Sequence, residues 1–252
     1  SGLRIIDVTN PAVPAQLGFY VTPGIAHDVF VSGNFAYVAD YTNGLRVINI
    51  TNPASPTESG FYDTVGYAKG VFVKDNTAYI ADNHGGFQLV NVTNPAAPAL
   101  ITIPLDTPGS ADDLVAVGDT VYLADHGAGL QVISVANLSV PTFIGAYRTV
   151  GDAQGIFVEG DTAYLTDGLG LWTVDISDPT QPTTTGFKAT TGGSRDVSVS
   201  GIYGAVAGGD AGVQFMGIIS PPTLTLYSTY NSPGFAYNAL VKDGGINVDD
   251  KV

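Results

Sequence analysis

A short phrase recurs along the chain at a nearly constant interval. It reads AYVAD, AYIAD, VYLAD and AYLTD, and the four copies end at Asp40, Asp82, Asp125 and Asp167. Successive copies therefore lie 42, 43 and 42 residues apart. A glycine followed by a large apolar residue comes shortly after each copy, as in Gly44-Leu45. Self-similarity at a fixed period is the signature of a repeat architecture, so the repeat constrains the fold more than composition does.

Each repeat divides into four short apolar segments separated by turn residues. The segments are rich in Val, Ile, Tyr and Thr, which favour strands, and none has a sustained helical period. In the second full repeat the predicted strands are Gly70–Asp75, Thr77–Asp82, Phe87–Val92 and Ala99–Leu105. The 32 Gly and 15 Pro of the chain suit many tight turns. Four strands within about 42 residues predict one blade of a β-propeller.

The two ends of the chain read as complementary halves of one repeat. Residues 235–250 align without a gap on residues 25–40, at an offset of 210 residues or five periods. The chain thus ends with the first two strands of a repeat and begins with the last two. Pairing such halves would close a ring and remove exposed sheet edges. We therefore predict an all-β, six-bladed β-propeller, a single domain over residues 1–252, whose closing blade is shared between the N- and C-terminal strands.

The third strand of the repeat carries a resemblance to a known family. The segments GLRIIDVTNP, GLRVINITNP, GFQLVNVTNP and GLWTVDISDP resemble the LVIVD-repeat signature, with AYVAD as the strand before it. A later repeat is degenerate, because GAVAGG replaces that phrase at residues 204–209. The resemblance implies a β-propeller of the kind found at the surface of bacteria and archaea, mostly without an assigned activity. It therefore implies an extracellular or cell-surface location.

Charge and composition exclude two classes of partner. The net charge is −14, from 9 basic and 23 acidic residues, and this field repels nucleic acid and anionic membrane surfaces. No apolar run is long enough to span a bilayer, and there is no cysteine for disulfide or thiolate chemistry. We expect no nucleic acid and no membrane insertion. The expected partner is a protein, a glycan or a second copy of the chain.

The aspartate that ends each second strand is the most regularly repeated acid. One interpretation is a ring of metal ligands. The favoured interpretation is structural, because one acid per blade at the same phase is typical of a scaffold residue that accepts hydrogen bonds from backbone amides of the following turn. The set comprises Asp40, Asp82, Asp125, Asp167 and Asp250.

The start of the first strand, nearest the expected propeller axis, is where the repeats diverge most. The residues there are polar, and they differ from blade to blade. Drift at a solvated channel mouth would explain this, and so would a binding site on the axis, where propellers commonly bind ligands. The candidate binding residues are His27, Asp28, Lys69, Asp112, Asp113, Gln154, Arg195, Asp196, Tyr237 and Asn238.

Three functions remain open from the sequence. The leading hypothesis is a non-enzymatic interaction or scaffold module, for which we expect no catalytic residue, metal or cofactor. The alternative is a metal-dependent hydrolase or lactonase-like enzyme, with Asp28, Asp112, Asp113, Asp196 and Asn238 as oxygen ligands on the axis. Lys69 and Arg195 share that ring and would oppose a cation. A purely architectural spacer is the third hypothesis.

The alternating apolar residues of the strands predict the core. Truncation of a fully buried one to alanine should cost roughly 2–4 kcal/mol. The predicted core residues are Val29, Val31, Tyr37, Val47, Val71, Val73, Tyr79, Leu89, Ile156, Val158, Tyr164 and Val174.

Overall fold

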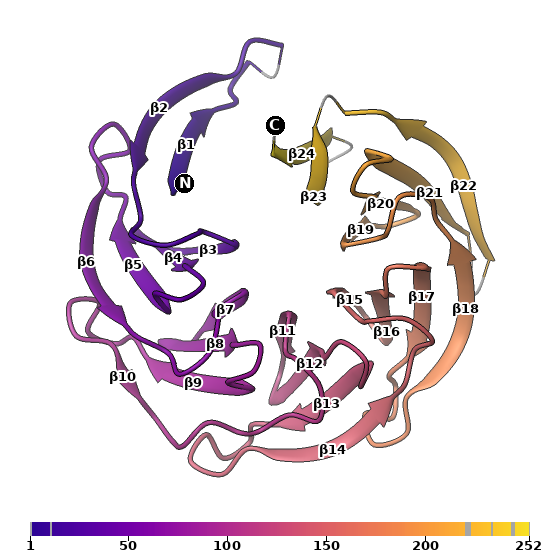
Figure 1. Cartoon of the computed structure of the whole chain (residues 1–252), viewed down its shortest axis with the longest axis horizontal. Helices are drawn as coiled ribbons and strands as arrows, with labels where there is room; N and C mark the ends of the chain where they lie inside the picture. Colours follow the sequence, from indigo (N-terminus) through magenta and orange to yellow (C-terminus); the bar gives the residue numbers. More distant parts are fainter. Residues whose placement is uncertain (1, 11, 220–222, 233, 243–244, 252) are drawn as a thin grey trace. The chain divides into compact units, whose positions relative to one another are not determined.

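A computed structural model describes residues 2–10, 12–219, 223–232, 234–242 and 245–251, and it divides the chain into two compact units. Unit 1 holds residues 1–111 and 138–140, and unit 2 holds residues 112–137 and 141–252. The regular elements of the described residues are antiparallel strands (Figure 1). No helix in those ranges is long and apolar enough to cross a membrane. The prediction of an all-β chain is confirmed.

Unit 1 contains two four-stranded sheets and one two-stranded sheet among the described residues. The two-stranded sheet pairs β1 (Leu3–Asp7) with β2 (Ala15–Tyr20). The next sheet orders β3 (Asp28–Ser32), β4 (Phe35–Ala39), β5 (Leu45–Asn49) and β6 (Thr57–Tyr62). The last orders β7 (Gly70–Lys74), β8 (Thr77–Ala81), β9 (Phe87–Asn91) and β10 (Ala99–Leu100).

Unit 2 repeats the same up-and-down order of strands. One sheet holds β11 (Asp113–Val117), β12 (Thr120–Ala124), β13 (Leu130–Ser134) and β14 (Thr142–Tyr147). The second holds β15 (Gly155–Glu159), β16 (Thr162–Thr166), β17 (Gly170–Asp175) and β18 (Thr183–Ala189). The third holds β19 (Asp196–Ser200), β20 (Tyr203–Ala207), β21 (Val213–Ile219) and β22 (Thr223–Tyr230). Finally, β23 (Phe235–Lys242) pairs with β24 (Gly245–Lys251).

The predicted repeat and the observed sheets agree closely, with one correction. The fourth strand of the second full repeat covers only Ala99–Leu100, not the predicted Ala99–Leu105. Pro104 has no amide hydrogen to donate to a strand ladder, and the pairing resumes only as a single bridge between Phe87 and Leu105. The two-stranded sheets β1-β2 and β23-β24 lie one in each unit, so their union into a sixth blade stays a prediction.

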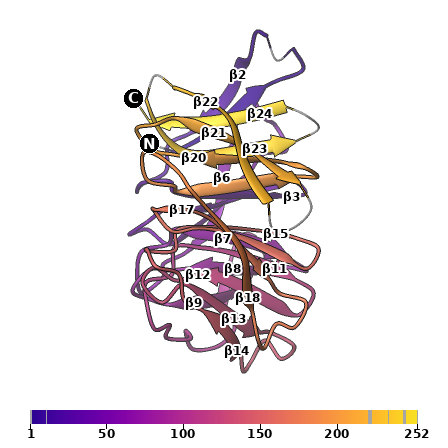
Figure 2. The ribbon, with the colours of Figure 1, turned by 90° about the vertical axis from the view of Figure 1, so that its right-hand side faces the viewer.

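Sheets that follow one another within a unit pack face to face, as the stacked strands of unit 2 in Figure 2 illustrate. Glycine on the fourth strand permits this close approach. A Cβ atom on Gly60 would lie 2.6 Å from the carbonyl oxygen of Pro95, and one on Gly145 would lie 2.2 Å from that of Pro179. The Asn-Pro and Asp-Pro turns of the sequence thus pack against the outer strand of the preceding sheet.

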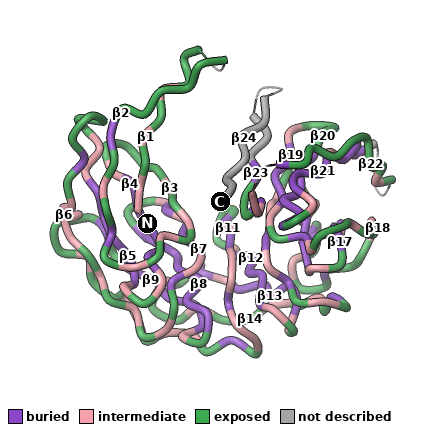
Figure 3. The backbone as a smooth tube through the Cα atoms, turned by 45° about the horizontal axis from the view of Figure 1, so that its top comes forward, coloured by how far each residue is buried: buried purple, intermediate pink, exposed green. Residues whose placement is uncertain are grey.

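The core lies between these sheets, and most of its buried residues belong to the second and third strand of a sheet (Figure 3). In unit 1 the second and third strands of the sheet β3–β6 are buried on both faces, because one face packs against β7–β10 and the other against β1-β2. Thus Tyr37 and Val38 are both buried, although their side chains point in opposite directions. Nine predicted core residues are confirmed as buried, namely Tyr37, Val47, Val71, Val73, Tyr79, Leu89, Ile156, Tyr164 and Val174. Val158 is half-buried and packs against the same core.

Two predicted core residues are exposed, so the prediction for them is wrong within the described structure. Val29 and Val31 on β3 are 46% and 58% exposed. Val71 and Val73 hold the same positions on β7 and are buried, because β7 packs against β3 and β4. The face of β3 that carries Val29 and Val31 has no such four-stranded sheet before it in unit 1.

Candidate functional site

Backbone bridges join several of the turns that follow a second strand to the segment that begins the next sheet. In unit 1, Tyr41 pairs with Ala68 through two N–H···O bonds of 3.0 Å. In unit 2, His126 pairs with Ala153 in the same way, also at 3.0 Å. Each of these bridges places the turn that follows a second strand beside the residues that begin the next sheet. The candidate binding residues therefore lie next to a row of turn residues that the sequence did not single out.

Three of the candidate aspartates join neighbouring sheets. The carboxylate of Asp28 accepts the amide of Val71 at 2.8 Å, and that of Asp113 accepts the amide of Ile156 at 2.9 Å. Asp196 accepts the amide of Ala239 at 3.3 Å. Each contact spans 43 residues, or one repeat. Burial raises the pKa of the Asp28 carboxyl, and these amide hydrogen bonds oppose the rise.

The other candidates of unit 1 are Lys69 and His27, and His27 is the first ring of a ladder of aromatic rings. His27 stacks on Tyr41 with ring centres 5.1 Å apart, and Tyr41 stacks on Tyr67 at 4.5 Å. Tyr67 meets the edge of His84 at 6.2 Å. His27, Tyr67 and His84 are exposed and Tyr41 is half-buried. Lys69 immediately precedes β7, two residues after Tyr67, and its amide donates to the carbonyl of Ala81 at 2.8 Å.

In unit 2, Asp112 pairs with a histidine from the neighbouring turn. Its Oδ2 lies 3.0 Å from Nε2 of His126, and Oδ2 of Asp152 lies 3.7 Å from Nδ1 of the same ring. The imidazole therefore sits between two carboxylates. Asp112 was predicted as a candidate, whereas His126 and Asp152 were not.

A second group of candidates in unit 2 is formed by Gln154, Arg195 and Tyr237. Nη1 of Arg195 donates to Oε1 of Gln154 at 3.3 Å, and its guanidinium carbon lies 5.8 Å from the centre of the Tyr237 ring. The same carbon lies 5.1 Å from the ring of Phe235. Asn238 is exposed beside Tyr237 on β23. The structure thus brings three of the ten candidates into direct contact.

The repeated aspartates of the second strands have a structural role, although their contacts differ from the prediction. Asp40 and Asp82 are fully buried, and each accepts an amide from the loop that precedes its own sheet, at 2.7 Å from Gly24 and Gly66. Asp167 also bonds to the predicted following turn, by accepting the amides of Leu169 and Gly170. Asp250 lies outside the residues whose side chains are described.

The carboxyl group of Asp82 is buried and is held by three hydrogen-bond donors. It accepts hydrogen bonds from Thr64 at 2.5 Å, from the amide of Gly66 and from the side chain of Gln88, which is itself fully buried. Desolvation by burial outweighs these donors and raises the pKa of Asp82 to about 6.

This pKa predicts a distinct pH dependence of stability. The folded pKa of Asp82 lies above its unfolded value, so the native state binds more protons between about pH 4 and 6. Its contribution to stability is therefore complete below pH 4 and is lost as the pH rises through 6. Asp82→Asn should flatten the fall in unfolding free energy over this interval, measured by urea denaturation at several pH values.

Asp175 is the matched control. A hydrogen bond from the amide of Ser177 lowers the pKa of Asp175, so its contribution is lost only as the pH falls below about 4. Asp175→Asn should keep the wild-type slope between pH 4 and 6. An equal change of slope in both variants would contradict the assignment to Asp82.

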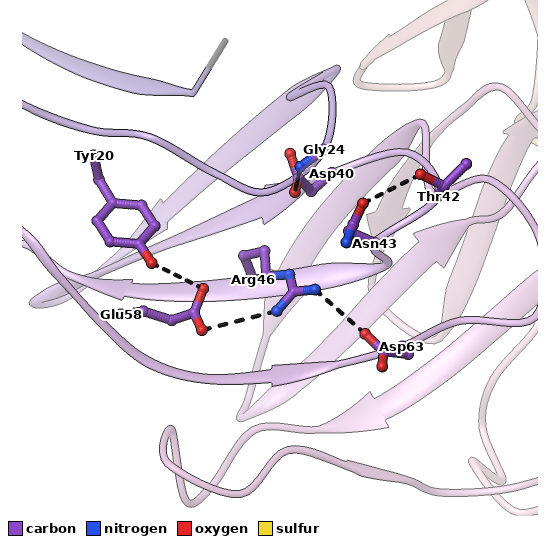
Figure 4. A network of polar contacts seen from close by, with 8 residues as sticks. All are labelled: Tyr20, Gly24, Asp40, Thr42, Asn43, Arg46, Glu58 and Asp63. Atoms are coloured by element: carbon purple, nitrogen blue, oxygen red, sulfur yellow. Dashed lines mark hydrogen bonds and ion pairs between the residues drawn. The ribbon is translucent and has the colours of Figure 1, made fainter.

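One polar network escaped prediction because its members lie on different strands. Arg46 on β5 is only 7% exposed, and Figure 4 shows its guanidinium between Glu58 and Asp63. The N–O distances are 3.8 Å to Glu58 and 3.4 Å to Asp63, and the Phe61 ring covers the guanidinium at 4.5 Å. Tyr20 donates to Glu58 at 3.3 Å and thereby links β2 to this network. The network joins the two-stranded sheet of unit 1 to the sheet beside it.

Within the described ranges no group of three or more His, Asp or Glu side chains has the arrangement of a metal site.

The repeat of this chain matches a known family of repeat proteins. The LVIVD repeat model matches residues 1–22, 23–64, 65–105, 108–149 and 150–190. The chain belongs to the LVIVD-repeat family. The resemblance noted in the third strands is thereby confirmed. Among curated proteins, no relative matches the chain.

Solved structures similar to this LVIVD-repeat protein are β-propellers at low sequence identity. A protein from Lactobacillus plantarum has a TM-score of 0.79 at 15% identity, covering 90% of this chain and 77% of its own. BamB from Moraxella catarrhalis has a TM-score of 0.65 at 12% identity, covering 94% and 83%. The Cps50 (Swd1) β-propeller domain of Myceliophteria thermophila has a TM-score of 0.62 at 11% identity, covering 84% and 74%. These similarities show the fold alone.

Proposed function

We propose that this LVIVD-repeat protein is a non-enzymatic interaction module of the cell surface or extracellular space, which binds a protein or glycan partner through the turns beside its strand starts. The aromatic ladder of unit 1 carries the proposal. It presents two histidines and two tyrosines along one row of turns. The net charge of −14 favours solubility of the protein although aromatic rings are exposed on its surface.

The backbone of Tyr41 supports a binding role for the ladder. Tyr41 has φ of 55°, in the left-handed region that a bulky residue rarely adopts. Asn83 has the same conformation in the next repeat at φ of 51°, and asparagine tolerates it better than tyrosine does. Folding alone would favour glycine or asparagine at this position. The strained tyrosine therefore supports a role in binding, since strained residues cluster at functional sites.

The proposed module is a closed ring of six blades. We infer that β23 and β24 complete the sheet begun by β1 and β2, since the sequences of the two ends are complementary halves of one repeat. The apolar side chains of Val29 and Val31 support this inference, because their counterparts Val71 and Val73 are buried by a preceding sheet. Closure would give β3 the same cover.

The hydrolase alternative is less well supported. It requires oxygen ligands that are available to a cation. The carboxylates of Asp28 and Asp113 already accept two backbone amides each, one from their own strand and one from the next sheet. Metal analysis of the purified protein would decide between the two functions.

Substitution of the ladder tests the interaction module. Labelled protein should bind to the surface of the source cells, and Tyr41→Ala with Tyr67→Ala should reduce this binding at least about tenfold, because aromatic residues dominate binding energies at interfaces. Tyr203→Ala is the matched control, since Tyr203 is 54% exposed on β20 and lies outside the ladder.

The folding of each variant is measured separately by thermal unfolding. Equal binding by wild type and the double variant would remove the ladder from the interface. A cytosolic location of the protein in its source cells would overturn the proposed function itself.

A further inference from the structure

Arg195 of unit 2 is an exposed arginine held in place by uncharged neighbours. The rings of Phe235 and Tyr237 lie 5.1 and 5.8 Å from its guanidinium carbon, and Gln154 accepts one N–H at 3.3 Å. Among the described residues no carboxylate lies within ion-pair distance of Arg195. The chain has 23 acidic and 9 basic residues, so an arginine with no acidic partner among the described residues is unexpected.

Two glycines keep the surroundings of Arg195 open. Gly168 and Gly209 occupy the turn position that Tyr41 and His126 hold in other repeats, with φ of 78° and 55°. A Cβ atom on Gly209 would lie 2.8 Å from the ring of Phe235. Gly209 thus makes room for one of the two rings that support Arg195. This gives a physical reason for Gly209 within the degenerate phrase GAVAGG at residues 204–209.

Gly168 leaves open space beside the side chain of Gln154. A Cβ atom on Gly168 would meet only Nε2 of Gln154, at 3.8 Å. Since Oε1 of Gln154 accepts from Arg195, its NH₂ group is the part of the amide that remains to donate. The glycine therefore leaves space next to a second hydrogen-bond donor.

A β-bulge aims Tyr237 at the same place. The register between β23 and β24 shifts between Ala236 and Asn238, so Tyr237 is the extra residue of the bulge. Bulges re-aim side chains and are common beside binding sites. Tyr237 is 37% exposed, and its ring lies 4.7 Å from that of Phe235.

These groups match one ligand chemistry. Arginine has five N–H donors and no acceptor, so the bond to Gln154 leaves four for a ligand, and the Gln154 amide adds its own. A donor-only site fits an acceptor-only group, and the planar guanidinium binds a carboxylate through two parallel hydrogen bonds. We propose that Arg195, Gln154 and Tyr237 bind the carboxylate of an acidic sugar. The proposal rests on the proposed interaction function. It names the class of ligand that a second site, in unit 2, would bind.

A sugar acid fits the site better than other anions do. The net charge of −14 opposes dianions and runs of negative charge more strongly than it opposes a single carboxylate. The exposed ring of Tyr237 beside the guanidinium suits the C–H face and hydroxyl groups of a sugar ring, since tyrosine combines an apolar body with a polar tip.

Titration calorimetry with the full chain tests the proposal. The probes are methyl glucuronoside, its neutral counterpart methyl glucoside, and N-acetylalanine as a carboxylate without a sugar. We expect the glucuronoside to bind most tightly, and Arg195→Gln to weaken it about tenfold to a hundredfold, as for the loss of charge-assisted hydrogen bonds. Raising the salt concentration should also weaken binding.

Two further variants make the result specific. Arg148→Gln removes the same charge from an exposed loop of unit 2 and should leave the affinity unchanged. Gly168→Asn restores the residue type found at Asn83 and should weaken binding by placing a side chain beside Gln154. Thermal unfolding reports whether each variant is folded, and Arg195→Lys replaces Arg195→Gln if the latter is not.

The outcomes separate this inference from the proposed function. Equal affinity of wild type and Arg195→Gln overturns the site, and N-acetylalanine binding as tightly as the glucuronoside overturns the sugar class. If no probe binds while the ladder variants still abolish attachment to cells, the carboxylate site is wrong and the interaction function stands.

Discussion

Removal of residues 235–252 is expected to destabilise the protein severely and to make it aggregate. In unit 2, β23 packs against β19 and β20, and its loss would expose Ala205, Ala207 and Val213, which are now fully buried. If β23 and β24 also complete the sixth blade, the truncated chain keeps an open β1 edge and the uncovered Val29 of β3. Exposed strand edges and apolar faces promote aggregation. Thermal unfolding and size-exclusion chromatography measure both effects.

A circular permutant distinguishes closure of the ring from a local effect of the deletion. Val252 is joined directly to Ser1, and new ends are opened between Thr42 and Asn43. Thr42 is the repeat equivalent of Val252, at an offset of 210 residues, and Asn43 is the equivalent of Ser1, at an offset of 42. The permutant keeps every strand and moves the shared blade to another repeat. It should fold with a Tm within a few degrees of wild type. An unfolded permutant would refute the six-bladed ring.

The repeat predicted the strands well because its information is local. Turn residues such as Asp75 and Asn76, with φ of 49° and 61°, adopt the left-handed conformation that their side chains tolerate. The burial of both faces of β4 was not predictable from alternation along one strand. It depends on a second sheet packing against the far face, and Val38 at 1% exposure shows this effect.

The candidate site was only partly predictable, since its contacts cross between repeats. The divergent strand starts pointed to Arg195, Tyr237 and His27 of the ladder, but not to its other members, Tyr41, Tyr67 and His84, which belong to turns and loops. One available signal was missed. Aspartate at 28 and 113 alternates with glycine at 70 and 155 in the same repeat position, and the structure explains the aspartates as acceptors for the amides of the next sheet.

The acid of each second strand illustrates the same limit. Its structural role was predicted, yet Asp40 and Asp82 bond to loops 16 residues earlier in the chain. No local pattern identifies a partner at that separation. Asp167 accepts the predicted amides of the following turn, and it also accepts from the amide of Gly151 at 2.9 Å and from Trp172 at 2.7 Å.

Leu165→Ala is expected to cost about 3 kcal/mol of unfolding free energy, within the range for fully buried leucines. Leu165 on β16 is 0% exposed and lies between Ile156 and Trp172 of the flanking strands. Its removal leaves a cavity that strands on both sides hold open, because their ladders fix the backbone spacing. For a chain of this length the loss corresponds to a fall in Tm of roughly 6–12 °C.

Leu169→Ala is the matched control for that substitution. Leu169 is the same residue type, four positions further along, and is 50% exposed in the turn after Asp167. Its truncation should change the unfolding free energy by no more than about 0.5 kcal/mol. Chemical denaturation of the two variants under identical conditions gives the comparison. Because Leu165 packs among residues of two neighbouring sheets, a cost as small as that of Leu169 would mean that face-to-face packing of the sheets is not what stabilises unit 2.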